Sequence, residues 1–429
     1  MARIIKKKKN HAEARLQKVI KQSPDYQKPV CAHFHECGGC SLQHYQYEKQ
    51  LKAKEEQVGD TLQRLGGFSD FKLLPTLSSV DIFHYRNKME FSFSRQRWIT
   101  EAEIAAGIHV EKNSVYLGLH AKGFYEKVID IQTCYLVKPV VSDILAAVRD
   151  IAIDSKLPVY STRDHEGFWR FLVIRSCQNT DDLMVNVVTT EYDERIAEKI
   201  KSLSSQFPQI TSLLYSTTVN KASVAFTEHE YLLAGKNKII EKLGRFQFEI
   251  SANSFFQTNT KQAERLYDVV LDYADLQGNE IVYDLYCGAG TISLYVSDYV
   301  RQVVGFEAIE SAVKDAKRNA VLNSVRNCEF VPGDLRDQLL DTKDIIARFG
   351  KPEVMIIDPP RSGMHPKTVK SILYLQPDRI VYVSCNPATL ARDLKELARD
   401  YRLIKVQPVD MFPHTAHIEA VAQLIRNIN

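Results

Sequence analysis

The stretch that decides the fold is Ile281-Val-Tyr-Asp-Leu-Tyr-Cys-Gly-Ala-Gly290, an apolar run that ends in an acidic residue and two closely spaced glycines. The apolar run predicts a buried strand, and the glycines predict a turn at which a ligand can approach the main chain. Helices and strands alternate beyond it: helices 291–299 and 309–322, and strands 303–306, 329–331, 354–357, 380–384, 403–406 and 417–424. This alternation predicts a doubly wound, Rossmann-like α/β sheet.

The turn at Gly288 and Gly290 predicts a site for a nucleoside cofactor. Glu307 ends the second strand of the sheet, where its carboxylate can bind two ribose hydroxyls. A dinucleotide is the alternative ligand, but Ser293 stands where the dinucleotide fingerprint has its third glycine. Without a pyrophosphate to bind, S-adenosylmethionine (SAM) fits the turn better.

Val381-Tyr-Val-Ser-Cys-Asn-Pro387 places a cysteine at the tip of a strand, and a helical stretch over 388–398 follows. Cys385 is therefore a candidate nucleophile, because the start of a helix favours a thiolate. A cysteine in an apolar strand is more often an inert core residue. Asp358-Pro-Pro-Arg361 ends another strand of the sheet and is expected beside the cofactor; amino-group methylases with a similar motif carry an aromatic residue where Arg361 stands.

Cys31, Cys37 and Cys40 lie within ten residues, and Gly38-Gly39 allows the tight turn that brings their sulfurs together. The spacing predicts a metal site that needs a fourth ligand. Cys134 is the best-placed candidate, and Cys177, within an alternating strand pattern, is the weaker one. Zinc and an iron–sulfur cluster both accept four thiolates, and the spacing does not separate them.

The chain divides into three predicted regions. Residues 1–30 form a basic tail with nine Lys or Arg against two acids and a short helical piece; such a run is usually solvated, although it can add affinity for a phosphate backbone. Residues 31–250 form a central metal-binding and RNA-binding domain that is β-rich from about residue 80. Its helix 45–66 ends at Gly66-Gly67 and can pack on the third region, the catalytic domain 251–429.

Basic and aromatic residues interleave along one segment of the central domain, at Tyr85, Arg86, Lys88, Phe91 and Arg95. This pattern suits contacts with an RNA backbone and stacking on bases. An ordinary amphipathic strand with a charged outer face is the alternative interpretation.

Composition excludes several classes of protein. Hydrophobic residues make up 45% of the chain, charged residues 25%, and the net charge is only +3. No apolar run is long enough to span a membrane, and the start of the chain lacks the apolar stretch of a secretion signal. Eight cysteines in a chain of 429 residues favour metal binding or catalysis over disulfides. We therefore expect a cytoplasmic protein without a membrane partner.

Taken together, the motifs resemble those of the RNA uracil-5-methyltransferase family, which makes 5-methyluridine in 23S rRNA and in the T-loop of tRNA. The resemblance runs from about residue 31 to the end of the chain. Besides the motifs described above, the segments 253–259 and 417–419 contribute to it. It implies that Cys385 is the nucleophile and Glu419 the base. It further implies a SAM site lined by Gln257, Tyr286, Gly288, Glu307, Asp334 and Asp358, and a [4Fe-4S] cluster on Cys31, Cys37, Cys40 and Cys134, as in the rRNA-modifying members.

The resemblance predicts a monomer that acts on RNA, with 23S rRNA ahead of the tRNA T-loop. Many relatives carry an OB-type RNA-binding module before the cluster, and 30 residues are too few for one. Phe255 and Phe256 are candidates to fill the gap that a flipped-out base leaves in the RNA. A non-catalytic RNA-binding assembly factor and a redox enzyme built around the cluster are the alternatives from other classes.

Overall fold

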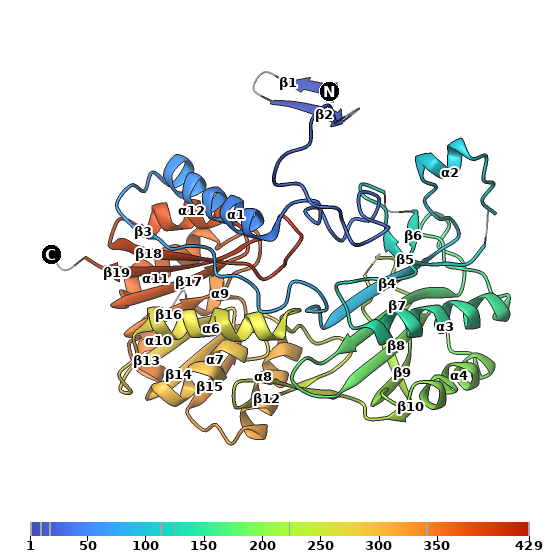
Figure 1. Ribbon diagram of the computed structural model, residues 1–429. Helices are drawn as coiled ribbons and strands as arrows, with labels where there is room; N and C mark the ends of the chain where they lie inside the picture. Colours follow the sequence, from blue (N-terminus) through green and yellow to red (C-terminus); the bar gives the residue numbers. More distant parts are fainter. Residues whose placement is uncertain are drawn as a thin grey trace.

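The computed structural model describes residues 2–8, 11–16, 19–111, 114–124, 126–222, 224–339 and 342–427. Two large sheets lie side by side in it, the C-terminal one to the left and the central one to the right in Figure 1. The predicted α/β class and the alternation of strands and helices in the C-terminal part are confirmed.

In the described residues the C-terminal sheet has eight strands, and its first five in spatial order are parallel. The order in which the strands are added reverses at β13, because β14 lies on one side of it and β16 on the other. Such a reversal opens a ligand crevice at the carboxyl ends of the strands. In spatial order the strands are β15 (Cys328–Pro332), β14 (Gln302–Glu307), β13 (Ile281–Leu285), β16 (Val354–Ile357), β17 (Arg379–Ser384), β19 (Glu419–Arg426), β18 (Tyr401–Val409) and β3 (Lys72–Leu73).

Both faces of this sheet are buried, as the continuous apolar runs of its strands predict. Along β13, Val282 faces one cluster of core residues, while Tyr283 and Leu285 face the other. The first cluster includes side chains of α6 (Thr260–Ala274), α7 (Thr291–Val296) and α8 (Glu310–Leu322). The second includes side chains of α1 (Tyr47–Thr61), α9 (Leu335–Gln338), α10 (Thr342–Phe349), α11 (Pro366–Leu375) and α12 (Pro387–Leu397).

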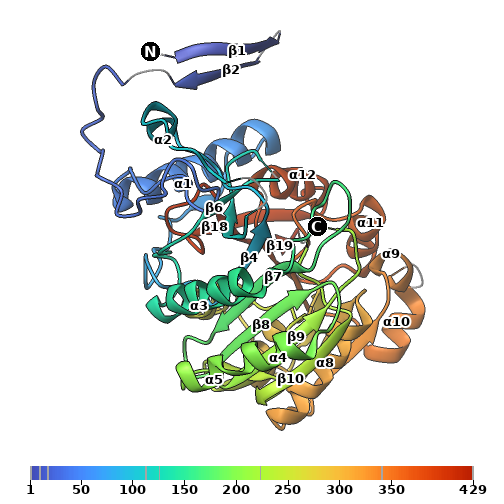
Figure 2. The ribbon, with the colours of Figure 1, turned by 90° about the vertical axis from the view of Figure 1, so that its right-hand side faces the viewer.

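The central sheet has seven strands, and α3 (Pro139–Ser155) and α4 (Glu194–Lys201) pack on one of its faces (Figure 2). Val141, Leu145 and Val148 of α3 meet Leu172 and Ile174 of β7 in a continuous core. In spatial order the strands are β10 (His229–Gly235), β9 (Ser212–Thr217), β8 (Leu183–Thr189), β7 (Trp169–Ser176), β4 (Lys88–Ser94), β5 (Tyr116–His120) and β6 (Val128–Asp130). Short helices α2 (Glu101–Ala105) and α5 (Leu203–Gln206) lie in its connections.

Helix α1 belongs to the packing of the C-terminal sheet although it precedes the central sheet in sequence. Val58 and Leu62 are fully buried in the cluster that α12 completes. A π-helical turn at Leu62–Gly66 follows α1 and packs against α12, where a Cβ on Gly66 would lie in ordinary contact, 3.5 Å, with the Ala391 methyl. Gly67, with φ of 77°, then ends the helix as predicted.

One sequence prediction is wrong in its local structure. The predicted short helical piece of the tail is a two-stranded antiparallel sheet in the described residues, β1 (Ala2–Lys8) with β2 (His11–Leu16), above the rest of the molecule in Figure 1. The hairpin of β11 (Ile239–Leu243) and β12 (Phe246–Ile250) is separate from the central sheet. Its residues Phe246 and Phe248 share a core with α6.

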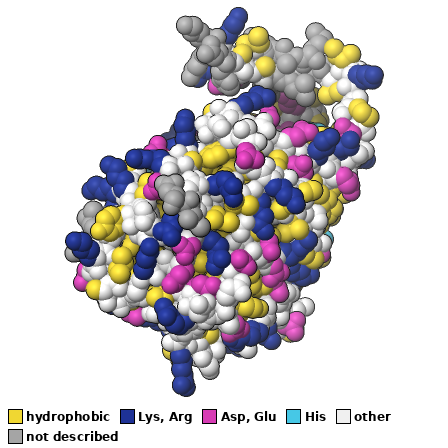
Figure 3. Space-filling view, turned by 90° about the vertical axis from the view of Figure 1, so that its left-hand side faces the viewer, with side chains coloured by type: hydrophobic (Ala, Val, Ile, Leu, Met, Phe, Trp, Pro, Cys, Tyr) yellow, Lys and Arg dark blue, Asp and Glu magenta, His cyan; other side chains and the backbone are white. Residues whose placement is uncertain are grey.

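Figure 3 shows the face beside the C-terminal strands, where Lys and Arg side chains are interspersed with acidic and hydrophobic ones. Among the described residues, no helix combines the length and the apolar character needed to cross a membrane.

Candidate active site

A cavity of about 820 Å³ lies at the carboxyl ends of the parallel strands, beside β13, where the strand order reverses. It brings together every residue that the sequence assigned to the cofactor and to catalysis. These are Gln257, Tyr286, Gly288, Glu307, Asp334, Asp358, Cys385 and Glu419. These residues come from seven separate segments, so the sheet assembles one site from residues distant in sequence.

The turn after β13 presents bare main chain to this cavity. Gly288 has φ of 54°, and a Cβ added to it would meet no atom within 4 Å, so the space beside it is open to a ligand. Gly290, with φ of 79°, is required for a steric reason. A Cβ added at this position would lie 3.0 Å from the Phe330 ring, closer than normal packing allows. Tyr286 also adopts a positive φ of 67°, a conformation that a non-glycine residue holds only when its surroundings enforce it.

Glu307, at the end of β14, accepts hydrogen bonds from two main-chain amides. Its carboxylate oxygens lie 3.1 Å from the Gly288 nitrogen and 2.8 Å from the Ile309 nitrogen. The carboxylate therefore braces the glycine turn from the neighbouring strand and stands at the cavity wall. Asp334 lines the same wall but pairs with Arg336, and this partner lowers the pKa of its carboxyl to about 2.

Asp284, behind the glycine turn, is fully buried. The Ser293 hydroxyl donates a hydrogen bond of 2.5 Å to one carboxyl oxygen, while the other oxygen has no partner. Burial raises the pKa of the Asp284 carboxyl to about 7. Ser293, which replaces the third glycine of a dinucleotide fingerprint, is thus a packing partner of the strand rather than a contact to pyrophosphate.

Cys385 follows β17 and directly precedes Asn386, the N-cap of α12. The Asn386 side chain accepts from the Ala388 nitrogen and donates to the Arg361 carbonyl, which ties the cysteine to the loop after Asp358. The start of α12 favours a thiolate, but other influences on Cys385 act in the opposite direction. Burial, together with the charges of Glu419 and Asp358, raises the pKa of the Cys385 thiol.

Glu419 is the first residue of β19 and stands beside Cys385. Ser384 pairs with Ala420 across the antiparallel β17 and β19, so the next pair in register is Cys385 with Glu419. Glu419 is only 8% exposed. Burial, and secondarily the charge of Asp358, raises the pKa of the Glu419 carboxyl well above its usual range, and burial raises that of Asp358 to about 7.

The cavity also contains aromatic residues that the sequence reasoning missed. Tyr267 of α6 lines it and shares a hydrogen bond of 3.0 Å with Thr291, and Phe412 lines it from the turn before β19. The helical spacing of the apolar face of α6 indicates only that Tyr267 is buried. No local signal places Phe412, since its position depends on the packing of the turn.

Phe255 connects the cavity to a second hollow on the central sheet. It is 74% exposed and lines both, and Arg86 and Lys88 line the second hollow. Phe256 is 4% exposed and packs in the core, so only Phe255 is free to enter a gap in an RNA stack. The prediction that Tyr85 stacks on a base is wrong. Tyr85 is 1% exposed in the core of the central sheet, and its ring is not accessible to a base.

The four cysteines predicted to bind metal line one small cavity between the first loop and the central sheet. Burial is the main cause that raises the pKa of Cys37 to about 11 and of Cys40 to about 12, and the charges of the other cysteines add to both shifts. Cys177 lies elsewhere, in a hydrophobic core. Among the described residues, no group of three or more His, Cys, Asp or Glu is placed to hold a single metal ion.

The sequence pattern of the tRNA (uracil-5-)-methyltransferase family matches residues 181–427. The chain belongs to this family. An RNA methyltransferase of Chlorobaculum tepidum is 46% identical over 98% of this chain and 88% of the relative. One of Porphyromonas gingivalis is 42% identical over 99% of this chain and 92% of the relative.

A solved structure agrees with the family assignment along the whole chain. The tRNA (uracil-54, C5)-methyltransferase of Pyrococcus abyssi, in complex with S-adenosyl-L-homocysteine, is 31% identical. The match covers 98% of this chain and 91% of that chain, with a TM-score of 0.74. The protein is therefore a SAM-dependent RNA methyltransferase, and the mixed α/β fold predicted from its sequence is that of such an enzyme.

The first prediction concerns the carboxylate that braces the glycine turn of the methyltransferase. Glu307→Ala should weaken SAM binding by about 1 to 3 kcal/mol, because a charged hydrogen-bond partner is lost. Titration calorimetry measures the effect. Glu310→Ala is the matched control, since Glu310 begins α8 in solvent and lies outside the cavity. Equal affinities in the two variants would remove Glu307 from the cofactor site.

The second prediction concerns pH. The folded state holds the Asp358 proton up to about pH 7, whereas the unfolded chain releases it near pH 4, so the free energy of unfolding falls as pH rises through this window. Between pH 5 and pH 8 the wild type should lose about 2 to 3 kcal/mol relative to Asp358→Asn. Urea unfolding at both pH values measures this. Exposed Asp70→Asn is the control and should follow the wild type; parallel pH curves for Asp358→Asn would refute the raised pKa.

Proposed function

We propose that this methyltransferase methylates C5 of a uridine in RNA, with Cys385 as nucleophile and Glu419 as base. The observation that carries the proposal is the register of β17 and β19, which sets the thiol beside the carboxyl at the wall of the cofactor cavity. The reaction needs a nucleophile that adds to C6 and a base that removes the C5 proton, and a thiol and a buried carboxyl in that position suit these two roles.

Uracil C5 is a weak nucleophile, so a covalent step must activate it first. The Cys385 thiolate adds to C6, and the electrons of the C5–C6 double bond move toward the O4 carbonyl to give an enolate. SAM, when bound, would supply the electrophilic methyl group for C5 and leave as S-adenosyl-L-homocysteine. Burial and the charges of two carboxyls raise the pKa of the Cys385 thiol, so the site without ligands disfavours the thiolate.

The methylated adduct still carries a hydrogen on C5. Glu419 removes this proton, the C5–C6 double bond re-forms, and the Cys385 thiolate leaves. Burial raises the pKa of Glu419, which makes its ionised form a stronger base but also disfavours that form unless a positive charge lies beside it. Asp358, at the same wall, faces the site of the reaction with a second carboxyl of raised pKa.

The target base must leave its stack to reach the cavity. Phe255 stands at the junction between the cavity and the hollow lined by Arg86 and Lys88. We propose that its exposed ring occupies the gap in the RNA and that the two basic residues contact the neighbouring phosphates. Lys88 forms an ion pair of 2.5 Å with Glu90, so its contact requires an exchange of partners.

We further propose that Cys31, Cys37, Cys40 and Cys134 hold a [4Fe-4S] cluster. The donor set fits, because four thiols line one cavity and thiolates are the ligands that such clusters take. The resemblance to the rRNA-modifying members of the family supports 23S rRNA as the substrate. The similarity to the Pyrococcus abyssi tRNA enzyme supports the tRNA T-loop as the second candidate. The cytoplasmic location and the monomeric state stay predictions.

The third prediction tests the chemistry. Cys385→Ala should abolish both methyl transfer and any covalent protein–RNA species. Glu419→Gln should still attack and methylate, but release should stall because an amide does not accept the C5 proton. With labelled cofactor, Glu419→Gln should accumulate a denaturation-resistant adduct that carries the methyl group. If Glu419→Gln turns over at the wild-type rate without an adduct, another group is the base.

The fourth prediction concerns the metal. Anaerobically purified protein should be brown and contain about four irons and four sulfides per chain. Cys134→Ser should lose them, whereas Cys177→Ser should keep them, because Cys177 lies in a different core. Stoichiometric zinc without visible absorbance would contradict the cluster, and loss of iron from Cys177→Ser alone would contradict the choice of ligand.

The fifth prediction separates the substrates. Deletion of the gene should remove 5-methyluridine from 23S rRNA while tRNA position 54 keeps it, as mass spectrometry of both RNAs would show. The opposite pattern would assign the enzyme to tRNA. Unchanged 5-methyluridine in both RNAs would contradict the proposed function.

A further inference from the structure

The turn between β18 and β19, residues 410–415, is hydrogen bonded along its whole length to parts of the chain that are far away in sequence. Asn259, the N-cap of α6, donates to the Met411 carbonyl at 3.1 Å, and Tyr85 of the central domain donates to the Pro413 carbonyl at 3.2 Å. Turns of this length are normally solvated at the surface. This one is built into the junction of the two sheets and leads, four residues later, to Glu419.

Helix α1 contributes a buried ion pair to the turn. Lys54 is 2% exposed and its ammonium lies 2.6 Å from the Asp410 carboxylate, whose side chain is fully buried. The same ammonium donates to the Phe412 carbonyl at 3.2 Å, and Tyr47 donates to Asp410 at 2.9 Å. Lys54 therefore fixes the main chain of Phe412, whose ring lines the active-site cavity.

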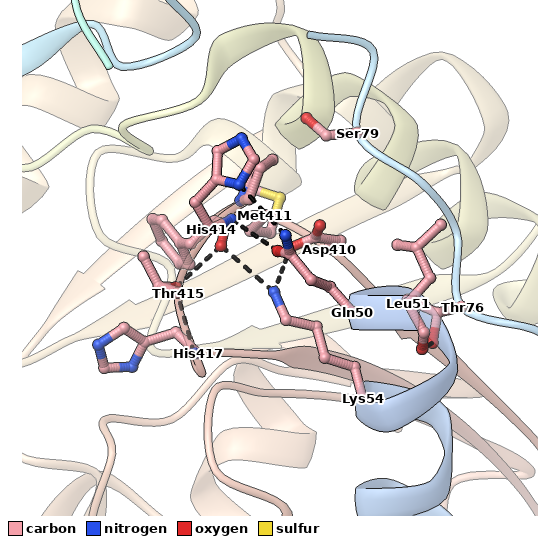
Figure 4. A network of polar contacts seen from close by, with 12 residues as sticks. Gln50, Leu51, Lys54, Thr76, Ser79, Asp410, Met411, His414, Thr415 and His417 are labelled. Carbon is pink, nitrogen blue, oxygen red and sulfur yellow. Dashed lines mark hydrogen bonds and ion pairs between the residues drawn. The ribbon is translucent and has the colours of Figure 1, made fainter. Parts of the chain in front are cut away.

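Gln50, one turn earlier on α1, holds the other end of the turn (Figure 4). Its fully buried amide accepts from the His414 nitrogen at 3.0 Å and lies 3.2 Å from the His414 ring. The same amide group donates to the carbonyls of Leu42 at 3.1 Å and Tyr45 at 2.7 Å. One side chain thus bridges the turn and the segment that follows the cysteine loop.

That segment also binds the turn directly. The nitrogens of Ser41 and Leu42, the two residues after Cys40, both donate to the His414 carbonyl at 2.9 Å. His414 itself has φ of 64°, a conformation that its contacts must enforce. A displacement of Cys40 would be passed to His414 through these two amides with no flexible side chain between them.

We propose that the 410–415 turn is a positioning element that couples the cysteine site to Glu419 and Phe412, with Gln50 and Lys54 of α1 as its two anchors. The inference rests on the proposed function in that it takes Glu419 as the base. It assigns Gln50 and Lys54 positioning roles, although neither lines the cavity. Through this turn the cysteine site would also affect proton removal by Glu419, besides any contact with RNA.

Two isotopes separate the steps. In a single turnover on RNA with tritium at C5 of the uridine, labelled cofactor reports methyl transfer and tritium release reports proton removal. Gln50→Met should transfer the methyl group at close to the wild-type rate but release tritium about 10- to 100-fold more slowly, because the base is displaced. The methylated adduct should accumulate, and the affinity for SAM should not change.

The controls lie on the same helix. Gln57→Met and Lys52→Met alter exposed residues of α1 that make no contact with the turn, and they should behave as the wild type. Lys54→Met should resemble Gln50→Met if it folds. Methyl transfer and tritium release that slow equally in Gln50→Met, or that match Gln57→Met, would overturn the positioning role.

Hydrogen exchange tests the coupling without activity. In full-length Cys134→Ser, the amides of residues 410–418 should exchange at least about 10-fold faster than in the wild type, while those of β14 and β15 should not change. Unchanged exchange at 410–418 would overturn the coupling. Glu419→Gln in the same isotope assay separates the two proposals: if it forms no adduct, the assignment of the base fails, and the exchange result alone decides the coupling.

Discussion

The buried ion pair between Lys54 and Asp410 is the interaction on which the arrangement of the parts depends. Both side chains are almost completely removed from water, which is unfavourable unless each charge finds partners. Here the carboxylate also accepts from Tyr47, and the ammonium also donates to the Phe412 carbonyl. Because these partners come from α1 and from the turn after β18, the pair fixes a helix near the start of the chain to the strand that carries Glu419.

The active site concentrates buried carboxyls. Asp284, Asp358 and Glu419 all have raised pKa values because burial disfavours their charged forms. A cationic ligand reverses this tendency, since a positive charge nearby favours the ionised carboxylate. Asp358 and Glu419 line the cavity, so it is suited in charge to a sulfonium cofactor, and the same positive charge would favour the Cys385 thiolate.

The same cavity extends from the cofactor-binding turn to the proposed RNA-binding surface. On one side the parallel sheet offers bare main chain at Gly288 and a carboxylate at Glu307. On the other side Phe255 leads to the hollow with Arg86 and Lys88 on the central sheet. The two sheets share buried side chains, with Met184 and Leu214 of the central sheet in the cluster that includes α6. The cavity thus lies at the junction of the two sheets, and the shared core residues fix the position of one sheet relative to the other.

The sequence by itself determined the α/β class, the glycine turn, the end of the N-terminal helical stretch at Gly67, the set of eight cavity residues and the four cysteines. Each of these follows from patterns within a few residues or from the family resemblance. Tertiary structure alone decided that Tyr85 is buried, which helix of the catalytic domain α1 contacts, that Phe412 lines the cavity and that burial raises the pKa of Cys385. These features depend on which distant surfaces exclude water together. A local pattern encodes the conformation of its own backbone, but burial and the charges that surround a group are set by segments that lie elsewhere in the sequence.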